Sequence, residues 1–231
     1  MSHFPLYCET GHSWLGIAEP VNFATNAFIL IAAAMAGRMI LRSPYRHDWD
    51  LWLLVALLAA TGIGSFLWHG WRTAFNLALD TYCGLLFLLC LVWRWSGMVW
   101  GRRAGVLGVL GLIGGGFVSL ALAFHMMAGA PMALRPLMLA PFFFVVVILG
   151  TALTAGAYRK IPDAGRYGVL AMAAGLIAAT ARSVDLPLCP WVPTGTHFLW
   201  HGFLSLAALS GIAVLQTLKA NERTGPFMAP K

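Results

Sequence analysis

The sequence predicts an all-α integral membrane protein in which a single domain, residues 1–231, forms a seven-transmembrane helix bundle. Sixty per cent of the 231 residues are hydrophobic and only 10% are charged, whereas soluble domains carry about a quarter charged residues. The apolar residues form long blocks, and about 20 apolar residues are needed for a helix to span a bilayer. These blocks are continuous, whereas a transmembrane β-barrel needs short segments of alternating polarity.

Seven apolar blocks are long enough to cross a membrane. They are residues 20–41, 51–69, 77–97, 104–126, 134–155, 166–183 and 197–218. Residues 1–19 are expected to form an external N-terminal segment, and residues 219–231 a cytoplasmic tail. The N-terminal segment has no apolar core of the kind that a cleaved signal peptide needs. We therefore expect the first block to act as the insertion signal.

The placement of basic residues predicts the orientation of the bundle. When the loops are assigned alternately to two sides, 12 of the 15 basic residues fall on one side and three, Arg72, Arg135 and Arg182, on the other. Lys and Arg accumulate in cytoplasmic loops, so the N-terminus is expected outside and the C-terminus in the cytoplasm. The acids among these basic residues are expected on solvated loop faces; they are Asp48, Asp50, Asp163 and Glu222. This bias explains the net charge of +7 without a nucleic-acid partner, and the expected partners are the membrane and a lipid substrate within it. The short loops suggest a bacterial inner membrane, or the ER or Golgi in a eukaryote.

Three histidines are predicted to meet on the external side. His197 and His201 are four residues apart at the start of the seventh block, so they share one helix face and can bind one metal ion. His69 closes the second block on the same side. Three protein ligands with an open fourth position are typical of catalytic zinc. The alternative is that His197 and His201 merely face lipid headgroups.

Two further polar residues are expected at the same depth. Asp80 opens the third block and is the candidate for proton transfer, although an aspartate there could simply cap its helix. Ser65 precedes His69 by four residues, so its hydroxyl could stabilise an oxyanion, or it could be a small residue that aids helix packing. The shared side and depth of these residues favour a zinc site with catalytic groups beside it.

At these residues the chain resembles the alkaline ceramidase family, within a wider group of seven-helix membrane hydrolases and receptor-like proteins. The matching residues are Tyr7, Cys8, Glu9, Ala18, Glu19, Asn22, Asn26, Gly64, Ser65, His69, Asp80, Asp185, Cys189, Gly195, His197 and His201. The wider group shares the serine, aspartate and histidine set. Two motifs point more narrowly to ceramidases. They are Cys8-Glu9, before the first block, and Ala18-Glu19-x-x-Asn22, at its start.

The resemblance implies a zinc-dependent membrane amidase that hydrolyses ceramide, an N-acyl sphingoid base, to a free long-chain base and a fatty acid. It implies that the three histidines hold zinc, that Asp80 carries the proton of the attacking water to the leaving amine, and that Ser65 stabilises the oxyanion. Three alternatives stay open. The substrate could be another N-acyl lipid. The chain could be a receptor-like or regulatory relative, similar to progestin and adiponectin receptors or haemolysin-like proteins. It could also be a transporter that uses the outer acids and histidines as an ion path.

The resemblance also implies a calcium site in the N-terminal segment. Glu9 and Glu19 match its carboxylates, and Tyr7 and Gly11 stand where other ligands would be. Leu6 replaces an aspartate of the family pattern, which removes one of the carboxylates that calcium favours. Cys8 and Cys189 both fall on the external, oxidising side. We therefore predict a disulfide between them.

Overall fold

The computed structural model describes residues 7–10, 13–126, 129, 137 and 139–224. Within these ranges the chain is built from α-helices, and no strand is present. The helices are α1 (Pro20–Thr25), α2 (Ala27–Leu41), α3 (Trp49–Trp71), α4 (Ala74–Trp100), α5 (Arg102–Met126), α6 (Ala140–Lys160), α7 (Pro162–Leu188) and α8 (His197–Thr224).

Seven helical segments are long and apolar enough to cross a membrane, which confirms the predicted fold class. The first of these segments, Pro20–Leu41, contains both α1 and α2. The two helices meet at Asn26, whose backbone keeps α-helical angles and whose side chain donates to the Asn22 carbonyl. The predicted block at 166–183 is longer in the structure, because α7 begins at Pro162. Proline at the first position and an acid in the first turn both favour a helix start.

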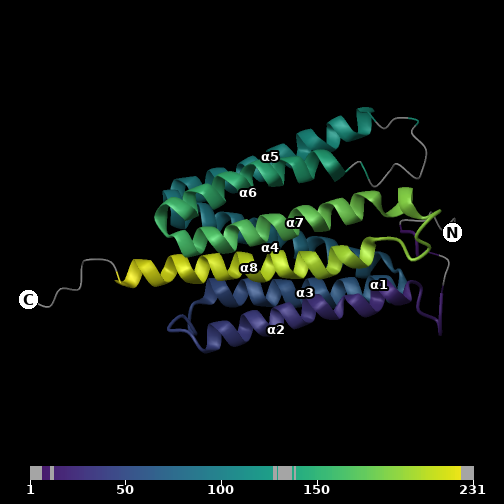
Figure 1. Ribbon diagram of the computed structural model, residues 1–231, viewed down its shortest axis with the longest axis horizontal. Coiled ribbons are helices and arrows are strands. Elements are labelled where there is room, and N and C mark those ends of the chain that lie inside the picture. Colours follow the sequence, from purple (N-terminus) through teal and green to yellow (C-terminus); the bar gives the residue numbers. More distant parts are fainter. Residues whose placement is uncertain (1–6, 11–12, 127–128, 130–136, 138, 225–231) are drawn as a thin grey trace, which may run out of the picture.

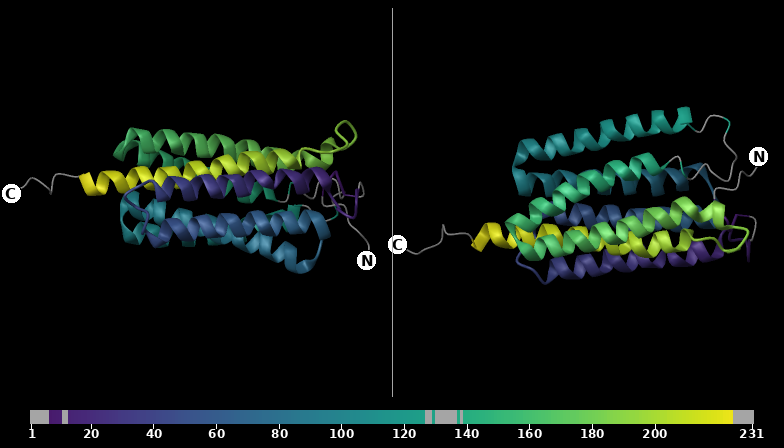
Figure 2. Two further views of the ribbon diagram at one scale, coloured as in Figure 1. Left: turned by 90° about the horizontal axis from the view of Figure 1, so that it is seen from below. Right: turned by 45° about the horizontal axis from the view of Figure 1, so that its top comes forward.

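The helices run side by side along the long axis of the molecule (Figure 1). α8 is the central helix and contacts α1, α2, α3, α4, α6 and α7. α5 packs mainly against α4 and α6 and stands at the edge of the bundle (Figure 2). α1 and α8 begin at the same end of the bundle, called here the histidine end, and α8 finishes at the opposite end (Figure 1).

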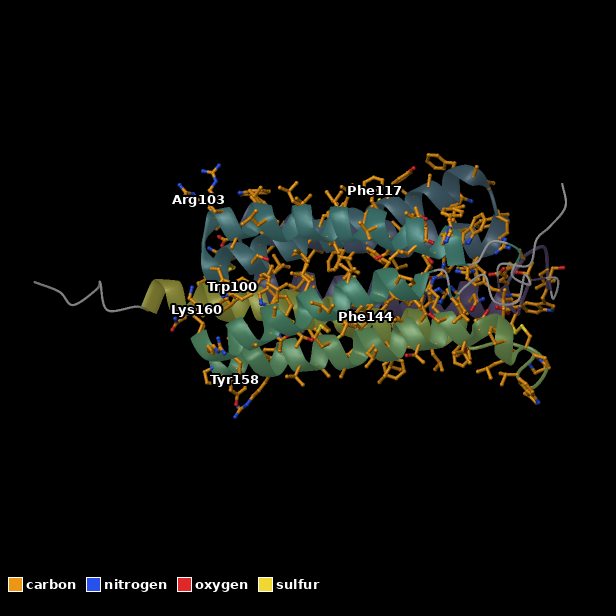
Figure 3. All side chains as sticks on the ribbon, turned by 90° about the horizontal axis from the view of Figure 1, so that it is seen from above. Trp100, Arg103, Phe117, Phe144, Tyr158 and Lys160 are labelled. Atoms are coloured by element: carbon orange, nitrogen blue, oxygen red, sulfur yellow. A yellow bond between two sulfur atoms is a disulfide. The ribbon has the colours of Figure 1, made fainter. Side chains whose placement is uncertain are left out.

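The lipid-facing surface and the opposite end show the side chains expected of a membrane protein. Phe117 and Phe144, 71% and 66% exposed, project from α5 and α6 (Figure 3). Arg103, Trp100, Tyr158 and Lys160 gather toward the opposite end (Figure 3). Aromatic and basic residues are enriched at membrane interfaces, and basic ones at the cytoplasmic interface. Their placement agrees with the predicted orientation, which stays a prediction.

A buried ion-pair network ties α3, α4 and α8 together at the opposite end. Asp50 is 5% exposed, although the sequence indicated a solvated loop residue. Its carboxylate lies 2.6 Å from Arg94 Nε and 2.9 Å from Lys219 Nζ. The reason for the difference is that α3 begins at Trp49, which carries Asp50 into the bundle. A buried charge is tolerated only when it is paired, and both partners come from other helices.

Candidate metal centre

The three predicted histidines meet at the histidine end of the bundle. His69 lies in the last turn of α3, and His197 and His201 occupy the first turns of α8. One ligand atom from each lies within 4.8 Å of the other two. The three residues are 0–2% exposed. The structure therefore confirms that they form one group that could hold a metal ion.

The hydrogen bonds of the histidines leave one nitrogen of each ring unused. His69 Nδ1 lies 2.5 Å from Glu19 Oε2, and His201 Nδ1 lies 2.9 Å from Thr25 Oγ1. The Nε2 atoms of both rings are buried without a hydrogen-bond partner, and so is His197 Nδ1. Buried polar atoms are nearly always satisfied. Orphaned nitrogens on three imidazoles whose ligand atoms lie within 4.8 Å of one another fit a metal ion.

Glu19 lies behind His69 and is fully buried. Its second oxygen, Oε1, accepts hydrogen bonds from Arg72 Nη1 at 2.5 Å and from Thr10 Oγ1 at 2.8 Å. Burial alone would raise the pKa of the Glu19 carboxyl, but the hydrogen bond from His69 and the neighbouring Arg72 cation hold this pKa below its ordinary value. An ionised carboxylate on Nδ1 fixes the tautomer and orientation of a metal-binding imidazole.

Asp80 and Ser65 are brought to the same level by the contact between α3 and α4. Asp80 lies near Ser65 and within electrostatic range of His69. The turn between the helices is short because Thr73 caps α4 by accepting from Asn76 N at 3.2 Å. Ser65 and Asp80 therefore lie near His69, and their catalytic roles stay predictions.

Gly64 makes this close approach of the two helices possible. A Cβ atom at Gly64 would lie 2.5 Å from the backbone nitrogen of Asp80 and 2.8 Å from the carbonyl carbon of Leu79. Both neighbours are backbone atoms of a helix, so they cannot rotate away as a flexible side chain could. Small residues let helix backbones touch in this way, and here the contact sets the position of Asp80.

The N-terminal segment covers the histidines. Tyr7, 7% exposed, stacks on His197 with ring centroids 4.0 Å apart, and its centroid lies 5.1 Å from that of His69. The neighbouring Cys8 forms a disulfide with Cys189, which confirms the predicted pair. The bond joins this segment to the chain just after α7. Tyr7 is thereby held against the rings of His69 and His197 at the end of the bundle.

Asp185 sets the start of α8. Its Oδ1 accepts from the backbone nitrogens of Thr196 at 2.6 Å and His197 at 2.8 Å, and its Oδ2 accepts from Cys8 N at 2.9 Å. Gly195 approaches this carboxylate so closely, with a positive φ of 68°, that only glycine fits. Asp185 and Gly195 belong to the residues that resemble the ceramidase family, but the resemblance gives them no role. The structure shows that they position His197.

Three of the predicted calcium ligands, Glu9, Glu19 and Tyr7, are described, and their side chains contact other groups of the protein. Glu9 accepts from the backbone nitrogens of Val21 at 2.5 Å and Asn22 at 2.8 Å, and so caps α1. Glu19 contacts His69 and Arg72 as described. Tyr7 stacks on His197, and Gly11 lies outside the described residues. Calcium binding stays a prediction.

Sequence reasoning missed the partners of the histidines. No sequence signal marked Thr25 as the partner of His201. Arg72 and Arg182 also lie near the histidines. Their position in the sequence could have drawn attention to them, because they lie on the side with few basic residues. Arg182 Nη1 donates to the Tyr7 hydroxyl at 3.4 Å, and its guanidinium lies over the rings of Tyr7 and Trp200. The third such arginine, Arg135, is outside the described residues.

Comparison with known proteins assigns no function to the chain. No family model, curated protein or solved structure matches the chain. The resemblance to alkaline ceramidases therefore rests on the quoted residues alone. What the structure shows by itself is a membrane-type helix bundle with a buried group of three histidines that could hold a metal ion.

Proposed function

We propose that the protein is a zinc-dependent membrane amidase of the alkaline ceramidase type, with ceramide or another N-acyl lipid as its substrate. One observation carries the proposal. Three histidine nitrogens without hydrogen-bond partners converge beside an acid and a hydroxyl, Asp80 and Ser65, at one end of a seven-helix bundle. Metal binding alone would not require the acid and the hydroxyl.

Each group has a distinct chemical task in this proposal. Zinc supplies Lewis acidity, which makes water a nucleophile near neutral pH. Asp80 accepts a proton from water and donates it to the leaving amine, because a carboxylate in hydrogen-bonding reach can act as both base and acid. Glu19 is not available for this task, since its oxygens bind Arg72 and His69. Ser65 donates its hydroxyl to the developing oxyanion during hydrolysis.

The covered end of the bundle favours entry of the substrate from the lipid. Tyr7 and the disulfide close the end over the histidines, which are 0–2% exposed. Trp200 on α8 is half-buried, and its ring lies 5.8 Å from that of Phe143 on α6. An apolar chain that moves laterally past these rings would bring its amide toward α8 and the histidines. A lipid amide meets this requirement because its chains already lie in the bilayer.

A receptor-like protein with a structural metal ion is the second candidate. The burial of the three histidines, which are 0–2% exposed, favours it, because a structural ion needs no access for a substrate. Against it, structural zinc usually has four protein ligands. Among the described residues, the group contains three side chains and no fourth His, Cys, Asp or Glu. The open position favours catalysis over a purely structural role.

Hydrolysis of N-acyl lipids separates these candidates. Zinc-loaded protein in detergent is expected to release fatty acid from ceramide or another N-acyl lipid, measured by mass spectrometry, and His197→Ala is expected to abolish the release because one of three metal ligands is lost. His125→Ala is a matched control, since this exposed histidine ends α5 and does not belong to the group. Full activity in His197→Ala would refute the amidase. Stoichiometric zinc without hydrolysis of any N-acyl lipid would favour the receptor-like candidate.

A further inference from the structure

We propose that Arg72 is a built-in cation that takes the place of the predicted calcium ion and, through Glu19, positions His69 for metal binding. This inference rests on the proposed metal centre but not on the identity of the substrate. It assigns Arg72 as a positioning residue, because the side chain acts on the metal ligand through a carboxylate and does not touch the ion.

The carboxylate oxygens that calcium would need already accept hydrogen bonds from Arg72 and from other N–H and O–H donors. Both oxygens of Glu9 accept backbone N–H groups at the start of α1. Glu19 Oε1 accepts from Arg72 and Thr10, and Oε2 is bound to His69 and to Asn22 Nδ2, the latter at 3.3 Å. Glu9 and Glu19 are 3% and 0% exposed. Calcium takes six to eight oxygen ligands, so it would have to displace these donors.

The guanidinium of Arg72 lies where a cation is needed. Nη1 is 2.5 Å from Glu19 Oε1, and Nη2 is 3.4 Å from Thr10 Oγ1. The group also lies over the rings of Trp68, at 4.5 Å, and Tyr7, at 5.6 Å. It therefore neutralises a buried carboxylate, which is costly to leave unpaired. It also links the N-terminal segment to the end of α3, as a bound calcium ion would.

The backbone of Arg72 supports a role for its side chain. Arg72 ends α3 in the left-handed conformation, with φ 53° and ψ 39°. A residue with a Cβ atom is disfavoured there, and glycine is the usual choice at such helix ends. Strained residues persist where the surrounding structure holds them in place, and they concentrate at functional sites. The contacts of the guanidinium with Glu19, Trp68 and Tyr7 are what holds Arg72 in this conformation.

The contacts form a chain that ends at the metal centre. Arg72 fixes one oxygen of Glu19, and the other oxygen accepts the Nδ1 proton of His69. The lone pair of His69 is then on Nε2, the nitrogen that has no partner. Partners of this kind set the orientation and basicity of a metal-binding imidazole, and their loss typically weakens metal binding about 10–100-fold.

Cobalt binding to the purified protein tests the inference without reference to hydrolysis. Arg72→Gly removes the cation and also relieves the left-handed backbone, so it is expected to fold. We expect this variant to bind Co²⁺ about 10–100-fold more weakly and to change the visible absorption of the bound ion. Arg72→Lys, which keeps the positive charge, is expected to restore much of the affinity. Leu15→Gly is the matched control, because Leu15 is the other described non-glycine residue with positive φ and is 79% exposed.

Calcium provides the second arm of the experiment. The wild-type protein is expected to show the same cobalt affinity and the same melting temperature in calcium-free buffer and in millimolar calcium. A clear rise of either quantity with calcium would overturn the inference, and so would wild-type cobalt affinity and spectrum in Arg72→Gly. If the wild-type protein binds cobalt as expected but hydrolyses no lipid amide, the proposed function fails and the role of Arg72 stands.

Discussion

Asp80→Asn is expected to keep the metal ion bound and to lower lipid-amide hydrolysis by about 10²–10⁴-fold, the usual contribution of a general acid or base. Asp80 does not belong to the group of ligand atoms formed by the three histidines. Asparagine has the same size and keeps a polar side chain beside Ser65, but it cannot take a proton from water. Zinc content and initial rates, measured on the same preparation, separate metal binding from proton transfer.

A second acid provides the control for this substitution. Asp163 is exposed, begins α7 at the opposite end of the bundle and pairs with Arg166. Asp163→Asn is expected to have the wild-type rate and zinc content. Wild-type hydrolysis in Asp80→Asn would remove Asp80 from the mechanism. Joint loss of zinc and activity in that variant would instead indicate that Asp80 maintains the metal centre.

Gly64→Ala is expected to lower both stability and activity. The added methyl group would lie 2.5 Å from Asp80 N, so α3 and α4 must move apart. Overpacking of this kind costs about 1–3 kcal/mol, and a displacement of about 1 Å in a catalytic group can cost about 10²-fold in rate. The melting temperature reports the first effect. The hydrolysis rate of zinc-loaded protein well below that temperature reports the second.

Gly97→Ala is the matched control, because Gly97 lies within α4 and a Cβ atom there would meet nothing within 4 Å. This substitution is expected to be neutral or slightly stabilising, since alanine favours helix more than glycine does. A Gly64→Ala protein with wild-type melting and rate would show that the close approach of α3 and α4 is not needed to place Asp80.

The seven spans and the histidine group were predictable from the sequence for simple physical reasons. A bilayer imposes a minimum length on each apolar helix, so the blocks at 51–69 and 77–97 correspond to α3 and α4 within a few residues. The spacing of His197 and His201 follows from the helical repeat. His69 was added because alternate spans return to the same side, which places the end of the second span and the start of the seventh on one side.

The partners of the histidines depend on tertiary contacts and were not predictable in the same way. A carboxylate such as Glu19 can bind calcium or orient an imidazole, and its residue type does not decide between them. In the structure Glu19 contacts Arg72 and His69, which are about 50 residues away in the chain. The prediction that Asp50 is solvated was wrong for the same reason, because its burial depends on Arg94 and Lys219 from two other helices.

Metal analysis of the purified protein is the most direct test of the central claim, that His69, His197 and His201 form one metal centre. After zinc loading and removal of free ion, we expect about one zinc ion per chain in the wild-type protein and in His125→Ala. Alanine at any one of the three positions is expected to abolish stoichiometric binding, because two imidazoles leave too few protein ligands for a stable zinc site. A wild-type protein that retains no more zinc than His69→Ala would contradict the claim.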